Sequence, residues 1–257
     1  MSASDSISAA INAARAQGKT ALVGFLTAGF PSRAVFKQNL LAVAECCDVV
    51  EIGVPFSDPM ADGTTIQRAS AVALANGVTL PWILEELRAV RPRPAAPLLL
   101  MSYLNPLLAF GLDQLPQAAL AAGVSGIIVP DLPFEESDEL RQALEKAGIA
   151  LVQMVTPVTP DARLVTLCAG ARGFIYAVTM TGTTGKSVAV PDDALDYMQR
   201  VKRASAIPVC AGFGIRSREQ VEKLGAYVDG VIVGSALVEI LERSEDPKPF
   251  LRSLRGS

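Results

Sequence analysis

Short apolar segments alternate with helical stretches about eight times along this chain, and this alternation constrains the fold more than any other feature. Near-continuous apolar runs that end in Gly or Pro are typical of strands in a parallel sheet covered on both faces. We predict strands at Ala21–Thr27, Val49–Val54, Pro97–Tyr103, Gly126–Val129, Ala150–Val155, Gly173–Val178, Ile207–Ala211 and Gly230–Val233.

The stretches between these strands carry apolar residues at helical spacing. They span Pro31–Cys46, Ile66–Ala75, Leu80–Val90, Leu112–Ala122, Glu135–Ala147, Pro160–Cys168, Asp192–Arg203, Arg218–Leu224 and Ala236–Arg243. A capped amphipathic helix at Ser4–Gln17 precedes the first strand, and we expect it to cover the bottom of a barrel. In a chain of 257 residues this order predicts an α/β fold, namely a single (β/α)8 TIM barrel domain over residues 1–257 with extended loops after strands 2 and 6. A doubly wound sheet is the alternative.

A carboxylate lies within the second predicted strand. The period of two places Val49, Glu51 and Gly53 on one face of this strand, so Glu51 points where apolar side chains belong. Burial raises the pKa of a carboxyl group, which yields an acid or base that works near neutral pH. A buried ion pair is the structural alternative for Glu51, and an ordinary turn aspartate is the alternative for Asp62 on the following loop.

Glycine-rich segments follow the later strands. A-G-F-G-I-R-S after the seventh strand and V-G-S-A after the eighth contain Gly214, Gly234 and Ser235. Their backbone N–H groups, with a helix N-terminus at Gly234–Ser235, predict a phosphate site of the kind that barrels often carry there. The Gly- and Thr-rich stretch from Met180 to Pro191 after the sixth strand is interpreted either as a mobile lid or as a plain surface loop.

The composition excludes several kinds of chemistry. The chain has no histidine, so Ser-His-Asp triads, Cys-His dyads and His-ligated metal sites are excluded, and acid–base work falls to carboxylates, Tyr or Lys. A net charge of -3 provides no basic field for nucleic acid or for an anionic membrane. The four cysteines form no C-x-x-C pair, which predicts reduced core thiols and no metal site. The N-terminal residues lack a signal-peptide pattern, and we expect a cytoplasmic protein.

The second predicted strand and the loop that follows it, from Val49 to Gln67, read V-V-E-I-G-V-P-F-S-D-P-M-A-D-G-T-T-I-Q. This segment closely resembles the signature of the tryptophan synthase alpha chain family. Further segments resemble that family in the same order over essentially the whole length: G-F-L-T-A-G-F-P, L-M-S-Y-L-N-P, G-I-I-V-P-D-L-P-F-E-E, G-F-I-Y-A-V-T-M-T-G-T-T-G, G-F-G-I-R and V-I-V-G-S-A-L-V. By this resemblance the chain is identified as a member of the family.

The resemblance implies a reaction and a partner. It implies retro-aldol cleavage of indole-3-glycerol phosphate to indole and glyceraldehyde 3-phosphate, without a cofactor in this chain. The indole then passes to a beta chain that carries pyridoxal phosphate and makes tryptophan, in an alpha-beta-beta-alpha complex. A stand-alone indole-3-glycerol-phosphate lyase and a non-catalytic activating subunit are the alternatives.

The resemblance also implies roles for particular residues. Glu51 is expected to be the general acid/base, and Asp62 is expected to accept a hydrogen bond from the indole N–H. The other expected roles are substrate binding by Phe25, Tyr103, Tyr176, Thr184, Gly185, Phe213, Gly214, Gly234 and Ser235, and a partner contact by Asp58. Met180 and Thr64 depart from the family pattern, where many members carry Arg and Pro.

Overall fold

The computed structural model describes residues 2–179, 191–212 and 214–255. In these residues all eight strands are parallel and form a closed barrel, in which each strand pairs with the next along the chain and β8 pairs with β1. The strands are β1 (Ala21–Thr27), β2 (Val49–Gly53), β3 (Leu98–Met101), β4 (Val124–Ile128), β5 (Ala150–Val155), β6 (Ile175–Val178), β7 (Val209–Gly212) and β8 (Gly230–Val233). The predicted (β/α)8 barrel is confirmed, and the doubly wound alternative is wrong because the β1–β8 pairing closes the sheet.

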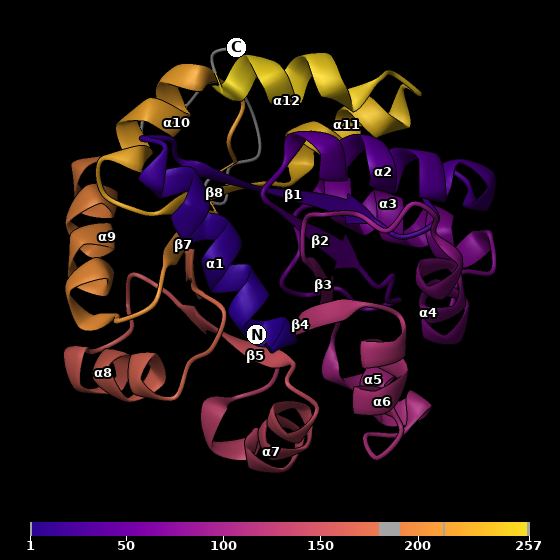
Figure 1. Ribbon diagram of the computed structural model, residues 1–257, viewed down its shortest axis with the longest axis horizontal. Helices are drawn as coiled ribbons and strands as arrows, with labels where there is room; N and C mark the ends of the chain where they lie inside the picture. The colour runs from indigo at the N-terminus through magenta and orange to yellow at the C-terminus, as the bar shows by residue number, and fades with distance from the viewer. Residues whose placement is uncertain (1, 180–190, 213, 256–257) are drawn as a thin grey trace.

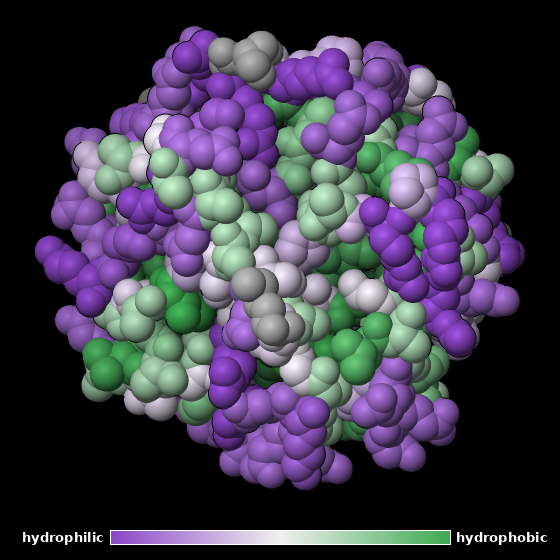
Figure 2. Space-filling view, in the orientation of Figure 1, coloured by the Kyte–Doolittle hydropathy of each residue, from purple (hydrophilic) through white to green (hydrophobic). Residues whose placement is uncertain are grey.

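Helices surround the barrel as an outer ring (Figure 1). The helix α1 (Ala3–Ala16) lies across one end of the barrel, and the surrounding helices are α2 (Phe36–Cys46), α3 (Thr64–Ala75), α4 (Leu80–Ala89), α5 (Leu104–Phe110), α6 (Leu115–Ala121), α7 (Asp138–Lys146), α8 (Asp161–Ala169), α9 (Asp192–Ala204), α10 (Arg218–Gly225), α11 (Ser235–Glu242) and α12 (Pro247–Arg255). Hydrophilic residues predominate at the rim of the face shown in Figure 2, as expected for the outer sides of amphipathic helices.

The N-terminal helix α1 closes one end of the barrel, as predicted. Its first turn is held by a capping box between Ser2 and Asp5. Ile7, Ile11 and Ala14 on its inner side are buried against the inward-facing residues of the strands. Figure 1 shows α1 lying across the ring of strands. The opposite end of the barrel, where the strands have their carboxyl ends, is left uncovered by α1.

The core has two layers, because successive side chains of a strand point to opposite faces. In β2, Val49 belongs to the cluster inside the barrel, whereas Val50 and Ile52 belong to the cluster between the barrel and its helices. Glu51 and Gly53 share the inward side with Val49. The period of two that we read from the sequence is thus confirmed for this strand.

The sequence pattern did not predict two of the helices, α5 and α12. No helix was predicted between the third strand and Leu112, but Leu104–Phe110 forms α5. Pro106 is tolerated because it lies in the first turn, where N–H groups have no intrahelical partner, and the Leu104 N–H instead donates to Oδ1 of Asp131 over 2.9 Å. Helix α12 begins at Pro247 and buries Leu251 and Leu254, so Ala236–Arg243 does not end the series.

Several helix boundaries also differ by a few residues from those predicted. The helix expected from Pro31 begins as a 3₁₀ turn at Arg33–Val35 and continues as α2, and the helix expected from Leu112 begins at Leu115. Terminal turns are the least regular part of a helix, so boundary differences of this size are ordinary.

Cys46, Cys47, Cys168 and Cys210 are all buried and unpaired, as predicted for core thiols. Over the described residues, no helix has the length and apolar character needed to cross a membrane. Within those same ranges, no group of three or more Cys, Asp or Glu side chains is arranged to hold a metal ion.

Candidate active site

A cavity of about 430 Å³ opens at the carboxyl ends of the strands. Predicted site residues from separate parts of the sequence line it together: Phe25, Glu51, Asp62, Tyr176, Gly214, Gly234 and Ser235. A larger hollow of about 690 Å³ lies outside the barrel between α2 and the α11–α12 connection. We place the site in the smaller cavity, because it collects residues from the strand ends and contains carboxylates without ion-pair partners in the described structure.

Glu51 is buried inside the barrel. Glu51 is 1% exposed, and it is paired with Phe25 on β1 and with Leu99 on β3. Oε2 of Glu51 has no hydrogen-bond partner among the described residues. Burial raises the pKa of Glu51 to about 8, and the nearby Asp62 carboxylate adds to the shift. This carboxyl group therefore holds its proton at neutral pH.

Asp62 lies on the loop between β2 and α3, at the rim of the same cavity. Burial raises the pKa of Asp62 to about 6, and a hydrogen bond from Tyr103 lowers it in part. The Tyr103 hydroxyl donates to Oδ2 of Asp62 over 3.2 Å and accepts the N–H of Ala61 over 2.8 Å. Its ring stacks on Phe56 with 5.1 Å between the centroids. The two carboxyl groups thus differ, since Asp62 is mostly ionised at the pH at which Glu51 is mostly protonated.

Tyr176 extends from β6 into the barrel beside the two carboxyl groups. Its ring lies next to Gly212, where an added Cβ would be 3.0 Å from Cε1 of Tyr176. Burial raises the pKa of the Tyr176 hydroxyl well above its usual value, and the charges of Glu51 and Asp62 raise it further. The phenol is therefore neutral and available as a hydrogen-bond donor.

The glycines of the predicted phosphate site lie at the other side of the cavity. Gly234 is the N-cap of α11 and Ser235 is its first residue, and the Gly234 cap makes no side-chain hydrogen bond. The first N–H groups of a helix lack intrahelical partners and carry the positive end of its dipole. Gly214, on the loop after β7, has φ of +65°, a conformation that favours glycine.

Some predicted residues lie elsewhere or outside the described structure. Asp58 is exposed on the loop after β2, away from the cavity lining. Tyr103 reaches the site through its hydrogen bond to Asp62. Thr184, Gly185 and Phe213, together with the departure at Met180, lie outside the described residues.

The sequence reading missed Met101, Met154 and Thr156, which also line the cavity. Their positions in the sequence could have indicated this, because Met101 is the last residue of β3, and Met154 and Thr156 lie at the end of β5. Inward-facing residues at strand ends line the mouth of a barrel. Methionine fills irregular apolar space without a fixed shape, so this wall of the cavity is adaptable.

The fold and the cavity together define a (β/α)8 barrel whose strand ends enclose two carboxyl groups and a glycine-lined helix N-terminus. The family model of the tryptophan synthase alpha chain matches residues 11–254. A tryptophan synthase alpha chain from Solidesulfovibrio magneticus is 43% identical over 244 residues, covering 95% of both chains. One from Bacillus mycoides is 44% identical over 236 residues, covering 91% of this chain and 92% of the relative.

Solved structures agree with the sequence relatives. Tryptophan synthase from M. tuberculosis in its aminoacrylate-bound form aligns with a TM-score of 0.87 and 34% identity, covering 97% of this chain and 98% of that chain. Tryptophan synthase subunit alpha from Legionella pneumophila aligns with a TM-score of 0.89 and 32% identity, covering 100% of this chain and 98% of that chain. The chain belongs to the tryptophan synthase alpha chain family, which is a family of lyases.

Proposed function

We propose that this chain is the alpha subunit of a tryptophan synthase and cleaves indole-3-glycerol phosphate to indole and glyceraldehyde 3-phosphate. One observation carries the proposal: Glu51 and Asp62 line a single cavity with Gly214, Gly234 and Ser235. A substrate with an indole ring at one end and a phosphate at the other fits that division into a carboxylate end and an anion end. The reaction needs no cofactor in this chain.

The cleavage breaks the bond between C3 of the indole ring and the first carbon of the glycerol chain. A proton must be added to C3, and the hydroxyl on the departing carbon must lose its proton to become the aldehyde. The electron pair of the broken bond returns to the ring, so one proton enters, one leaves, and nothing is oxidised or reduced.

Two carboxyl groups in different environments suit these tasks. Glu51, whose pKa lies at about 8, starts protonated and delivers the proton to C3. Its carboxylate then accepts the hydroxyl proton, which regenerates the acid. Asp62, whose pKa lies at about 6, is mostly ionised at neutral pH and accepts the indole N–H, which stabilises positive charge on the ring.

Other cavity residues hold the substrate in this proposal. Phe25 and Tyr176 face the ring, and the Tyr176 hydroxyl stays neutral because burial raises its pKa. Gly214, Gly234 and Ser235 bind the phosphate through N–H groups and the Ser235 hydroxyl. Thr184, Gly185 and Phe213 are assigned to the lid and the indole pocket from the family pattern alone.

The proposal includes a partner. The chain associates with a tryptophan synthase beta chain in an alpha-beta-beta-alpha complex, and pyridoxal phosphate belongs to that partner. Asp58, exposed on the loop that also carries Asp62, is assigned to the contact. This position would let the partner influence the acidic loop. The proposal places the complex in the cytoplasm.

The test is a direct assay of indole released from indole-3-glycerol phosphate, with and without a matched beta chain. Cleavage that the beta chain stimulates is the expected result. Equal turnover with and without the partner would instead identify a stand-alone lyase. If the chain never cleaves the substrate, yet the chain and its Glu51→Gln variant both activate the partner, it is a non-catalytic activating subunit.

A further inference from the structure

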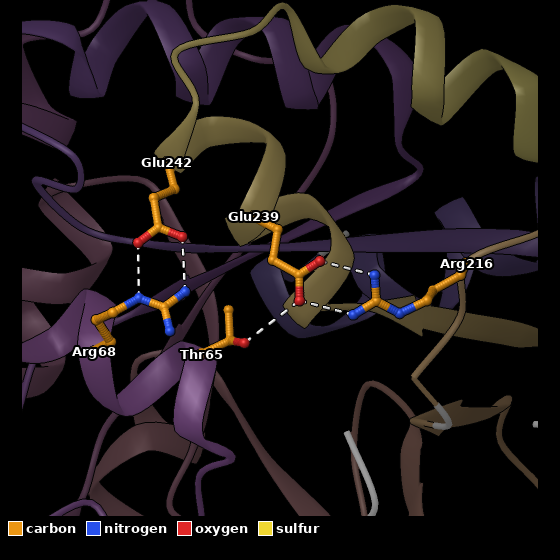
Figure 3. Close-up of polar contacts among 5 residues, drawn as sticks. All are labelled: Thr65, Arg68, Arg216, Glu239 and Glu242. Carbon is orange, nitrogen blue, oxygen red and sulfur yellow. Dashed lines mark hydrogen bonds and ion pairs between the residues drawn. The ribbon is translucent and has the colours of Figure 1, made fainter. Parts of the chain in front are cut away.

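Glu239 joins three connections of the barrel in one polar network, which we call the Glu239 bridge (Figure 3). Its Oε2 and Oε1 accept from Nη1 and Nη2 of Arg216 over 2.8 and 2.7 Å. The hydroxyl of Thr65 donates to Oε1 of Glu239 over 3.5 Å. Thr65 lies at the start of α3, Arg216 on the loop after β7, and Glu239 on α11.

Each member of the Glu239 bridge follows closely after a residue of the proposed site. Thr65 comes three residues after Asp62, and Arg216 comes two residues after Gly214. Glu239 lies four residues after Ser235, which is about one turn further along the helix. The bridge therefore connects the acidic loop with both parts of the anion-binding end.

The members of the bridge stand outside the cavity, since none of them is among its described lining residues. Thr65 is buried at 7% exposure, whereas the side chains of Arg216 and Glu239 are 38% and 29% exposed. The bridge can therefore act on a bound phosphate only through the backbone that it holds in place.

The ion pair with Glu239 also occupies the guanidinium of Arg216. A guanidinium can form bidentate pairs with both carboxylates and phosphates. Here both Nη atoms are directed at Glu239, whose pKa is held below its usual value chiefly by the hydrogen bond from Arg216. The loop that carries Gly214 is thus anchored to α11, and the cavity offers backbone N–H groups to an anion.

We propose that Glu239 is a positioning residue for the phosphate end of the site: by fixing Arg216 against α11, it keeps the Gly214 loop and the start of α11 in the arrangement that binds phosphate. The inference rests on the proposed function, because it takes Gly214, Gly234 and Ser235 as phosphate ligands. It adds a residue outside the cavity whose effect is on substrate affinity.

The chain offers a matched control on the same helix. Glu242 of α11 accepts from Nε and Nη2 of Arg68 over 2.7 Å each, again in a bidentate pair (Figure 3). This pair links α11 to α3 but does not involve the loop after β7. Glu242→Gln therefore removes the same kind of ion pair while it leaves the Gly214 loop anchored.

The experiment titrates glycerol phosphate into the wild type and the variants by calorimetry and records their thermal unfolding. Glu239→Gln is expected to raise the Kd for glycerol phosphate about fivefold, the size of effect that a partly exposed ion pair supports. Glu242→Gln is expected to leave the Kd unchanged, with a similarly small change in Tm. With indole-3-glycerol phosphate, Glu239→Gln should raise KM by the same factor and leave kcat unchanged.

Arg216→Gln distinguishes positioning from direct contact. It should weaken binding as much as Glu239→Gln, and the double variant should be no weaker than either single variant. Tighter binding by Glu239→Gln would show that a released Arg216 reaches the phosphate, which overturns the inference, as would equal Kd values for Glu239→Gln and Glu242→Gln. Wild-type protein that does not bind glycerol phosphate would remove the proposed phosphate site itself.

Discussion

Asp62 and Tyr103 are joined by a hydrogen bond of 3.2 Å between the phenol and Oδ2, although they lie 41 positions apart in the chain. The same hydroxyl accepts the Ala61 N–H over 2.8 Å. Tyr103 therefore holds both the backbone and the carboxylate of the acidic loop. Because a hydrogen bond to the ionised form lowers a pKa, Tyr103 also partly offsets the effect of burial on Asp62.

Tyr103→Phe should raise the pKa of Asp62 above its present value of about 6, because the carboxylate loses a donor while its burial persists. The Ala61 N–H also loses its acceptor, and the free energy of unfolding should fall by about 1–3 kcal/mol. The acid limb of the pH profile of kcat/KM should move to higher pH. An unchanged acid limb would mean that Asp62 does not control activity in that range.

Glu51→Gln should change how stability depends on pH. Because the folded-state pKa of Glu51 is about 8 and the ordinary value is 4.5, the folded protein keeps a proton that the unfolded chain has released. Stability from this group is therefore complete below pH of about 4.5 and falls as pH rises toward 8. The loss amounts to roughly 3–5 kcal/mol.

Denaturant unfolding of wild type and Glu51→Gln at pH 5 and pH 8 measures this effect, since glutamine does not titrate. The wild type should lose stability relative to the variant as pH rises. Parallel curves for the two proteins would contradict a raised pKa for Glu51. Glu45→Gln is a suitable control, because Glu45 is an exposed surface carboxylate paired with Lys248.

Gly53→Ala should damage the indole end of the cavity. A Cβ at Gly53 would lie 2.6 Å from Cζ and 2.8 Å from Cε2 of Phe25, so the buried ring must move. Overpacking of this kind costs about 1–3 kcal/mol of stability. KM for indole-3-glycerol phosphate should rise, while the Kd for glycerol phosphate should stay close to that of the wild type.

A second substitution separates this clash from a general loss of structure. If the Phe25 ring is the obstacle, Gly53→Ala should cost much less stability in a Phe25→Leu background than in the wild type. Equal destabilisation in both backgrounds would place the strain somewhere other than at Phe25.

The inward direction of Glu51 was predictable because it depends only on the period of two along one strand. The environment of Asp62 was not, because its partner Tyr103 comes from the end of another strand, and local sequence does not encode that contact. The Glu239 bridge could not be predicted for the same reason, because its three members lie on three separate connections of the barrel. Helix α5 has only seven residues, and one of them is Pro106. Proline is compatible with a helix only in the first turn, so the helix could not be predicted without knowing where it begins.

Glu51→Gln and Gly234→Val should separate chemistry from binding, because the two residues lie at different ends of the cavity. Glu51→Gln removes the proposed proton donor but keeps the shape, so kcat should fall by about 10²- to 10⁴-fold with little change in the Kd for glycerol phosphate. At Gly234 an added Cβ would meet only Cδ1 of Ile66 among the described residues, at 3.9 Å, so the first side-chain atom has room and the rest of a valine would occupy space in the cavity. Gly234→Val should therefore weaken glycerol phosphate binding at least tenfold while Tm stays near that of the wild type. Calorimetry and single-turnover assays measure the two effects separately, and equal loss of phosphate affinity in both variants would refute the assignment.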